Sequence, residues 1–325
     1  MCTAVSYKTK CHYFGRNLDL DRTFRENVVI TPRRFPFHFR MAGKLSEHYA
    51  MVGMAHVEQG YPLYYEASNE KGLSMAGLNF PDNAMYSSPA EGRLNLATFE
   101  FIPWILGRCA DLSQAEMELE NLTLVELDFS EKLPLSPLHW MISDSERSIT
   151  VESVAEGLKI YDNPVGVLTN NPTFEYHMRN LVKYMALSTS APENRAFSSL
   201  ELKPDSLGMG AVGLPGDLSS SSRFVRSAFV LANSVSGGEE EESISQFFHI
   251  LASVSQQRGC VVTDKGEYEQ TQYSSCCNTD RGIYYYRSYE NSRITAVDMH
   301  REDLESPELI IYPLMTKQDI RWQNG

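Results

Sequence analysis

The most distinctive chemistry in this 325-residue chain lies at Cys2, directly behind the initiator methionine. Once Met1 is removed, Cys2 carries both a thiol and a free α-amine. An unperturbed α-amine has a pKa of about 7.7–8.0, so it can accept a proton near neutral pH. Nucleophile and general base would then come from one residue, and cysteine profits most because its thiolate is a strong nucleophile. A cysteine at this position also occurs without any catalytic role.

Arg16 and Asp19 are the charged residues that a hairpin would return toward Cys2. An arginine beside a sulfur favours the thiolate, and an aspartate beside an α-amine can orient it. The alternative explanation for Arg16 and Asp19 is an ordinary surface ion pair.

Two predicted strands would position these three residues. Residues 2–7 alternate small or polar residues with β-formers, and residues 12–20 form a second run of this kind. A polar break at residues 8–10 separates them, and Gly15 permits close backbone approach. The pattern therefore predicts a hairpin that brings Arg16 and Asp19 near Cys2.

Two asparagines stand where a predicted strand ends near a proline. Asn79 lies in the strand end at residues 77–81, and Asn170 follows the predicted strand at residues 165–168. The ordinary explanation is a turn asparagine, which local backbone hydrogen bonding favours. The functional alternative is an oxyanion donor; for Asn79, spacing alone favours the turn.

Composition limits the classes of function. The net charge of −13 argues against a surface that binds nucleic acid or another polyanion. No apolar run approaches the roughly twenty residues of a membrane-spanning helix, and no charged-then-apolar leader is present, so we expect a soluble, cytoplasmic protein. The six cysteines are scattered without paired zinc-site spacing and do not look like a disulfide framework.

The order of predicted elements is strands, helices, strands, helices, strands, without repeating βαβ units or a glycine-rich nucleotide loop. Residues 113–116 have the spacing of a capping box and should begin a helix. This order predicts an α+β fold with mainly antiparallel sheets, and a single domain over residues 1–325. The predicted helices cover residues 99–109, 113–121, 174–185, 223–234 and 243–257.

Six ordered segments together resemble the choloylglycine hydrolase family of N-terminal-nucleophile hydrolases, and within it the bile salt hydrolases. They lie at residues 2–4 with 15–19, 77–81, 138–141, 168–174, 213–217 with 222–224, and 282–286. The resemblance implies a four-layered αββα sandwich, with two mainly antiparallel sheets between helical layers. It also implies a homotetramer and no metal or cofactor.

The resemblance also implies roles for individual residues. Cys2 is the nucleophile with its own amine as base, Arg16 lies against the sulfur, and Asp19 holds the amine. Asn79 and Asn170 form the oxyanion hole, and Arg223 adds positive charge to the site. Our candidates for the lining of an apolar substrate cleft, each of which is more often plain core, are Leu18, Tyr65, Phe129 and Leu133.

The activity implied is hydrolysis of the amide bond in glycine- and taurine-conjugated bile acids. A second possibility is a penicillin V acylase or another N-acyl amide hydrolase of the family; penicillin V acylases usually have tyrosine where this chain has Asn79, which favours bile salts. A third is a steroid- or lipid-binding protein without catalysis, against which the full set of catalytic residue types argues. The sequence leaves the preference between glycine and taurine open.

Overall fold

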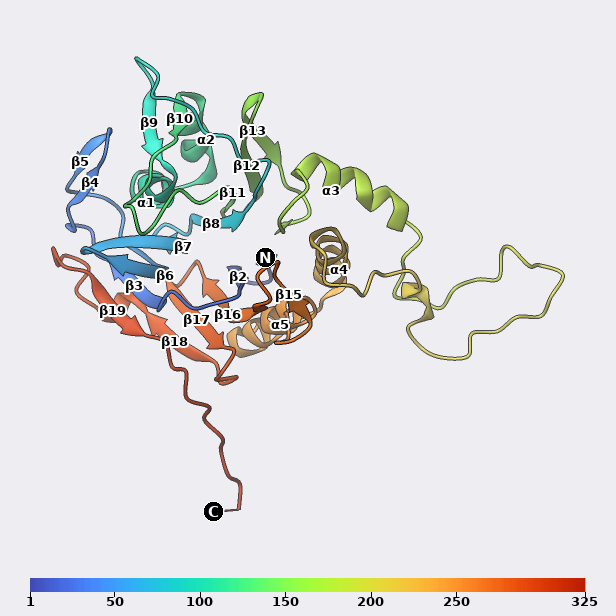
Figure 1. The fold of residues 1–325 in the computed structure, drawn as a ribbon. Coiled ribbons are helices and arrows are strands. Elements are labelled where there is room, and N and C mark those ends of the chain that lie inside the picture. Colours follow the sequence, from blue (N-terminus) through green and yellow to red (C-terminus); the bar gives the residue numbers. More distant parts are fainter. Residues whose placement is uncertain (325) are drawn as a thin grey trace.

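Two large antiparallel sheets lie face to face between layers of helices in the computed structural model, which describes residues 1–324 (Figure 1). The predicted αββα sandwich is therefore confirmed. The single-domain organisation stays a prediction. No described helix is long and apolar enough to cross a membrane.

The first sheet carries Cys2, Arg16 and Asp19 of the candidate site. It has seven strands in the order β14-β1-β2-β16-β17-β18, with β15 paired to β16. Their bounds are β1 (Cys2–Lys8), β2 (His12–Leu20), β14 (Val167–Leu168), β15 (Val261–Val262), β16 (Tyr268–Asn278), β17 (Ile283–Ser288) and β18 (Thr295–Asp298).

The second sheet has eight strands in the order β13-β12-β11-β8-β7-β6-β3-β19. Their bounds are β3 (Asn27–Thr31), β6 (Met51–Glu58), β7 (Tyr61–Asn69), β8 (Ser74–Asn79), β11 (Leu138–Ser143), β12 (Ser148–Val154), β13 (Gly157–Asp162) and β19 (Ile310–Pro313). Two small pairs lie outside both sheets: β4 (Phe37–Phe39) with β5 (Gly43–Leu45), and β9 (Leu94–Ala97) with β10 (Leu122–Val125).

The helices are α1 (Thr98–Arg108), α2 (Leu112–Glu120), α3 (Phe174–Leu181), α4 (Ser220–Asn233) and α5 (Glu240–Ala252), with 3₁₀ turns at Val182–Tyr184, Met209–Ala211 and Met299–Arg301. In Figure 1, α1 and α2 cover the eight-stranded sheet, α4 and α5 lie at the seven-stranded sheet, and the segment between α3 and α4 projects far from the body.

Three predicted helix starts were wrong. The N-cap of α2 is Asp111, which accepts a hydrogen bond from the Gln114 amide at 2.9 Å, so the predicted capping box at Ser113 does not form. α4 begins at Ser220 rather than at residue 223, and α5 begins at Glu240 rather than at residue 243. In α5 the acidic run fills the first turn, where it complements the helix dipole.

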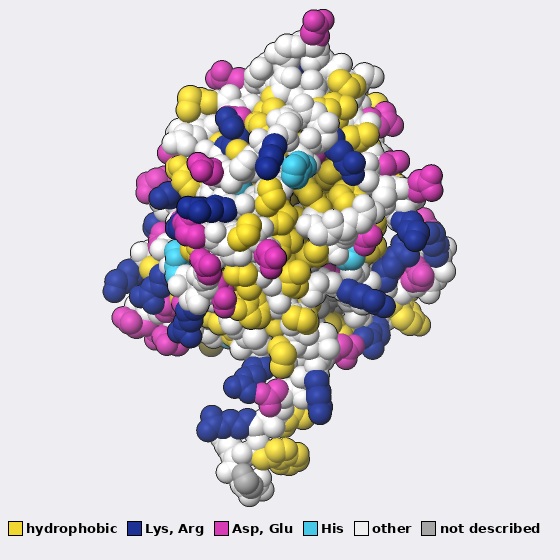
Figure 2. Space-filling model, turned by 90° about the vertical axis from the view of Figure 1, so that its left-hand side faces the viewer, with side chains coloured by type: hydrophobic (Ala, Val, Ile, Leu, Met, Phe, Trp, Pro, Cys, Tyr) yellow, Lys and Arg dark blue, Asp and Glu magenta, His cyan; other side chains and the backbone are white. Residues whose placement is uncertain are grey.

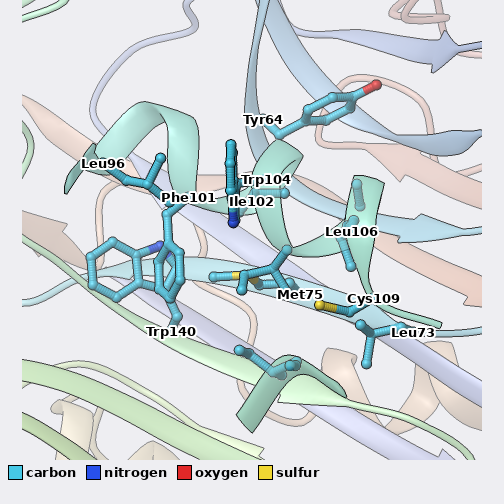
Figure 3. Packing of buried hydrophobic residues seen from close by; sticks show 14 of the residues in the cluster. Tyr64, Leu73, Met75, Leu96, Phe101, Ile102, Trp104, Leu106, Cys109 and Trp140 are labelled. Carbon is cyan, nitrogen blue, oxygen red and sulfur yellow. The ribbon is translucent and has the colours of Figure 1, made fainter. Parts of the chain in front are cut away.

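Apolar side chains form three core layers. Phe101 of α1, Met75 of β8 and Trp140 of β11 pack in the layer between the helices and the eight-stranded sheet (Figure 3). A second layer lies between the two sheets and contains Cys2, and a third packs α5 against the seven-stranded sheet. Because both faces of β1 are covered, successive residues Ala4 and Val5 belong to different layers.

The β1–β2 hairpin forms as predicted, with Cys2 opposite Leu18. Gly15 lies where β2 approaches β16 closely: a Cβ there would come within 2.0 Å of the Ser275 carbonyl oxygen. A glycine at this point therefore permits pairing of the N-terminal hairpin with the C-terminal half of the chain.

Candidate active site

Cys2 begins β1 and is 2% exposed. With Met1 in place, its backbone nitrogen is a peptide amide that donates a hydrogen bond to Asn170 Oδ1 at 2.7 Å. The Met1 α-amine donates to the Asp19 backbone carbonyl at 2.7 Å and pairs with Glu269. An amide nitrogen cannot act as a base, so the proposed chemistry needs the removal of Met1.

Arg16 is fully buried on β2. Its Nη1 donates to the carbonyl oxygens of Gly77 at 2.5 Å and Tyr65 at 3.1 Å, whereas its Nη2 has no partner among the described residues. Burial lowers the pKa of Arg16, but the negative charges of its neighbours, Cys2 foremost, outweigh burial and raise it above its ordinary value. Arg16 is therefore a permanent cation close to the sulfur.

Asp19 is also fully buried. Its Oδ1 accepts a hydrogen bond from Thr271 Oγ1 at 2.6 Å, and its Oδ2 has no partner among residues 1–324. Burial raises the pKa of Asp19, and Arg223 opposes that shift. A buried carboxylate oxygen normally has a hydrogen-bond donor. The free amine of processed Cys2 would supply the donor that Asp19 Oδ2 lacks.

The two asparagines lie together although the residues between them span six strands and two helices. Asn170 Nδ2 donates to the Asn79 backbone carbonyl at 2.7 Å, and Asn170 Oδ1 accepts from Cys2. An amide nitrogen carries two hydrogens, so one Asn170 N–H remains for another acceptor. Asn79 ends β8 and is exposed, so it stands at the open side of the buried cluster.

Arg223 reaches the site from α4. Its Nη1 donates to the Cys2 carbonyl at 2.5 Å and to Thr3 Oγ1 at 2.7 Å, and its Nη2 donates to Asn170 Oδ1 at 2.7 Å. Burial lowers the pKa of Arg223, whereas Asp19 raises it. The structure thus brings together all six residues predicted to be catalytic.

The four candidates for the substrate cleft divide into two groups. Leu18 and Tyr65 belong to or pack against the layer that contains Cys2. Phe129 packs instead with Tyr61 and Phe99 at ring centroid distances of 5.9 and 5.2 Å. Leu133 lies in the same connection between β10 and β11, and in the described part of the chain neither residue belongs to or packs against the apolar layer that contains Cys2.

Two surface cavities are present among the described residues. One of about 540 Å³ lies against Arg33, His48 and Arg108, and one of about 550 Å³ lies against Arg258 and Tyr289. Neither has Cys2 among its described lining residues. The apolar sterol cleft stays a prediction. In the described part of the chain, no group of three or more His, Cys, Asp or Glu side chains is arranged to hold a metal ion.

Sequence reasoning missed Glu66. This buried carboxylate on β7 accepts hydrogen bonds from Tyr273, Ser275 and Tyr284 at 2.7, 2.9 and 2.5 Å, and lies 3.9 Å from Arg16 Nε. Burial raises the pKa of Glu66, and Arg16 opposes the rise. The only local signal was an acidic residue inside a strand, which does not reveal hydrogen-bond donors that lie more than two hundred residues further along the chain.

Comparison with known proteins shows to which family the chain belongs. A family model described as linear amide C–N hydrolases, choloylglycine hydrolase family, matches residues 2–312. The chain belongs to the choloylglycine hydrolase family. Its relatives include a bile salt hydrolase/transferase of Lactiplantibacillus plantarum, 53% identical over 98% of both chains. The bile salt hydrolase/transferase of Clostridium perfringens is 38% identical over 96% of both chains.

Solved structures agree with this family assignment. A conjugated bile acid hydrolase from Clostridium perfringens, in which alanine replaces the cysteine at position two, matches with a TM-score of 0.93 and 37% identity, covering 100% of both chains. A penicillin V acylase from Agrobacterium tumefaciens matches with a TM-score of 0.73 and 21% identity over 95% of this chain and 90% of that one. At this identity the second match shows the fold alone.

Proposed function

We propose that this choloylglycine hydrolase family member hydrolyses the amide bond of glycine- and taurine-conjugated bile acids, with Cys2 as its nucleophile. The observation that carries the chemistry is the convergence of Arg16, Asp19, Asn170 and Arg223 on Cys2. Support for the substrate comes from relatives named bile salt hydrolases that are up to 53% identical to this chain.

The proposed reaction begins when the α-amine of processed Cys2 takes the proton of the thiol. The thiolate attacks the amide carbon, a C–S bond forms, and the carbonyl oxygen becomes an oxyanion. Asn79 and Asn170 stabilise that oxyanion; one such donor is typically worth about 2.7–4 kcal/mol. The ammonium returns its proton to the leaving nitrogen, and the C–N bond breaks.

A thioester remains on Cys2 after the glycine or taurine leaves. The free amine then takes a proton from water, the resulting hydroxide attacks the thioester carbon, and the C–S bond breaks to release the bile acid. Arg16 and Arg223 contribute positive charge while negative charge develops at the sulfur and the oxyanion.

A hydrolysis panel tests this function. We expect the protein to cleave glycocholate and taurocholate, and to cleave phenoxymethylpenicillin less efficiently. Activity should scale with the fraction of molecules whose intact mass shows loss of Met1. Cleavage of the penicillin with no cleavage of either conjugate would favour the alternative acylase, and full activity in a population that retains Met1 would rule out the α-amine as base.

Assembly and location form part of the proposal. We infer a homotetramer and a cytoplasmic location. The tetramer has support in exposed apolar side chains on the projecting segment between α3 and α4, including Phe197, Leu200, Leu202 and Leu207.

A further inference from the structure

His139 lies between the two segments that carry the proposed oxyanion asparagines. It is fully buried on β11, whose neighbouring residue Leu138 pairs with Asn79 of β8. The ring of Phe80, the residue after Asn79, stacks on the imidazole with centroids 4.2 Å apart and an interplanar angle of 7°. On its other side, His139 Nε2 is 2.8 Å from the Thr169 carbonyl oxygen.

Hydrogen-bond geometry fixes where the protons of this imidazole lie. A carbonyl oxygen only accepts, so Nε2 must carry a hydrogen toward Thr169. Nδ1 is 3.1 Å from Glu152 Oε1, which also accepts from the Phe174 amide at 2.8 Å. Two facing lone pairs would repel each other in this dry site, so a proton lies between Nδ1 and Oε1. Glu152 therefore fixes the orientation and the donor state of His139.

Both polar groups of the Asn170 backbone have a hydrogen-bond partner. Its amide donates to Ser220 Oγ at 2.9 Å, and its carbonyl lies 2.9 Å from His177 Nε2. Burial lowers the pKa of His177 to about 4, so that ring is a neutral donor at ordinary pH. Two consecutive carbonyls, of Thr169 and Asn170, are thus each fixed by an imidazole.

We propose that Glu152 and His139 are positioning residues that set the geometry of the oxyanion hole. His139 joins the Asn79–Phe80 turn, through ring stacking, to the Thr169–Asn170 segment, through a hydrogen bond. The Asn170–Asn79 hydrogen bond of 2.7 Å lies beside this link. The inference rests on the proposed function, because the spacing of Asn79 and Asn170 matters only if the two asparagines stabilise an oxyanion.

Two reactions of Cys2 separate positioning of the oxyanion hole from general stability. Amide hydrolysis develops an oxyanion and needs the two asparagines. Alkylation of the thiolate by iodoacetamide displaces iodide at a saturated carbon and develops none. A defect confined to the oxyanion hole should therefore lower kcat and leave the alkylation rate unchanged.

Three substitutions probe the pair. Glu152→Gln keeps the size of the side chain but cannot supply the shared proton. His139→Phe keeps a ring to stack on Phe80 and removes both nitrogens, whereas His139→Gln restores one N–H donor. A matched control is His12→Phe, because His12 is 1% exposed and both its ring nitrogens lie within hydrogen-bond distance of hydroxyls, at 2.9 Å from Ser6 and 2.8 Å from Thr279.

The measurements are kcat and KM for a conjugate, and the rate of Cys2 alkylation, each normalised to folded protein. We expect Glu152→Gln and His139→Phe to lower kcat about 10- to 100-fold, with KM and alkylation within twofold of wild type. His139→Gln should recover part of the lost kcat. His12→Phe should lower thermal stability and leave the ratio of kcat to alkylation rate unchanged.

Other outcomes overturn the inference. If kcat and alkylation fall together in Glu152→Gln, or if that variant keeps wild-type kcat, the pair is merely structural. If wild type cleaves no linear amide, the proposed function fails and the inference fails with it. If wild type cleaves conjugates and the three variants behave like His12→Phe, only the inference fails.

Discussion

Cys2 differs from the other cysteines in its surroundings. Burial raises the pKa of the Cys276 thiol well above its ordinary value, and raises those of Cys109 and Cys277 to about 12. Cys260 is exposed and has no part in the proposed site. Among the buried thiols, Cys2 is placed beside two buried guanidinium groups.

Iodoacetamide should therefore inactivate the protein by alkylating Cys2. We expect the loss of hydrolysis to follow the mass increase at Cys2, since the thiolate is the reactive form. Cys2→Ser should abolish turnover and still bind bile acid, because serine is a poorer nucleophile of similar shape. The control is Cys260→Ser, which should retain full activity and remove only the surface label. Inactivation that follows labelling of Cys276 or Cys277 would contradict the assignment of Cys2.

At the scale of elements, the approach of β2 to β16 predicts a strict requirement for glycine. Gly15→Ala should lower the free energy of unfolding by about 1–3 kcal/mol, the usual cost of overpacking, because the new Cβ would overlap the Ser275 carbonyl. Gly216→Ala is the matched control, since a Cβ there meets nothing within 4 Å. Denaturant titration of both variants measures the effect, and equal midpoints would show that β2 shifts at no cost.

The start of α4 predicts a pH-dependent contribution to stability. Hydrogen bonds from Ser219 and Ser222 lower the pKa of Asp217 from its ordinary value of 3.8 to about 2. Because the folded pKa lies below the unfolded one, the stabilisation is present above about pH 4 and is lost as pH falls from about 4 to about 2.

Asp217→Asn should lower Tm at pH 7 by about 1–4 °C, the effect of about 0.3–1 kcal/mol at a helix start. The difference from wild type should shrink between pH 4 and pH 2. Thermal melts across that range measure it. Asp205→Asn serves as control on an exposed residue of the same connection. A Tm difference that does not change with pH would exclude the Asp217 charge as its cause.

The connection between β10 and β11 tests the predicted sterol cleft. If the connection covers the sterol that both conjugates share, Phe129→Ala and Leu133→Ala should raise KM similarly for glycocholate and taurocholate. The reason is that each substitution removes apolar contact with the sterol, which contributes roughly 25 cal/mol per Å² of buried apolar area to binding. A short acyl-glycine without rings should show little change. A tenfold change in the glycine-to-taurine ratio would mean that these residues contact the amino acid end instead.

Local pattern predicted the α+β class, whereas the packing of the sheets and the roles of Asn79, Asn170 and Arg223 followed only from the family resemblance. Alternation in residues 2–7 and 12–20 predicted the β1–β2 hairpin, and hairpin geometry then placed Arg16 near Cys2. The pairing of β2 with β16 and the links from Glu66 to Tyr273 and Tyr284 could not be predicted, because nothing local encodes a partner so far along the chain. Ser113 was a wrong cap because Asp111 offers a stronger acceptor to the same first turn.

At the scale of the whole molecule, exposed apolar surface is distributed unevenly. Met185, Leu207 and Val212 are 79%, 102% and 75% exposed, and all three lie in or beside the segment that projects from the body in Figure 1. On the face of Figure 2, hydrophobic side chains gather along the middle, with charged side chains mostly toward the edges. Such surface commonly marks interaction sites.

If the projecting segment holds a tetramer together, Leu202→Ser with Leu207→Ser should reduce the mass measured by sedimentation velocity. Met117→Ser is the matched control, because Met117 is 63% exposed on α2, away from that segment. A tetrameric double variant would place the interface elsewhere, and a monomeric wild type at micromolar concentration would refute the tetramer.

The pairing of the first hairpin with β16 has a consequence for the order of events during synthesis. Asp19 and its partner Thr271 are 252 residues apart, which corresponds to about 13–50 s of translation at about 5–20 residues per second. For most of that interval, Gln256 and Glu269, whose side chains later contact Met1, have not yet been synthesised. An aminopeptidase that acts on the ribosome would therefore meet an unobstructed Met1, and it would free the Cys2 amine before the contacts around Met1 form.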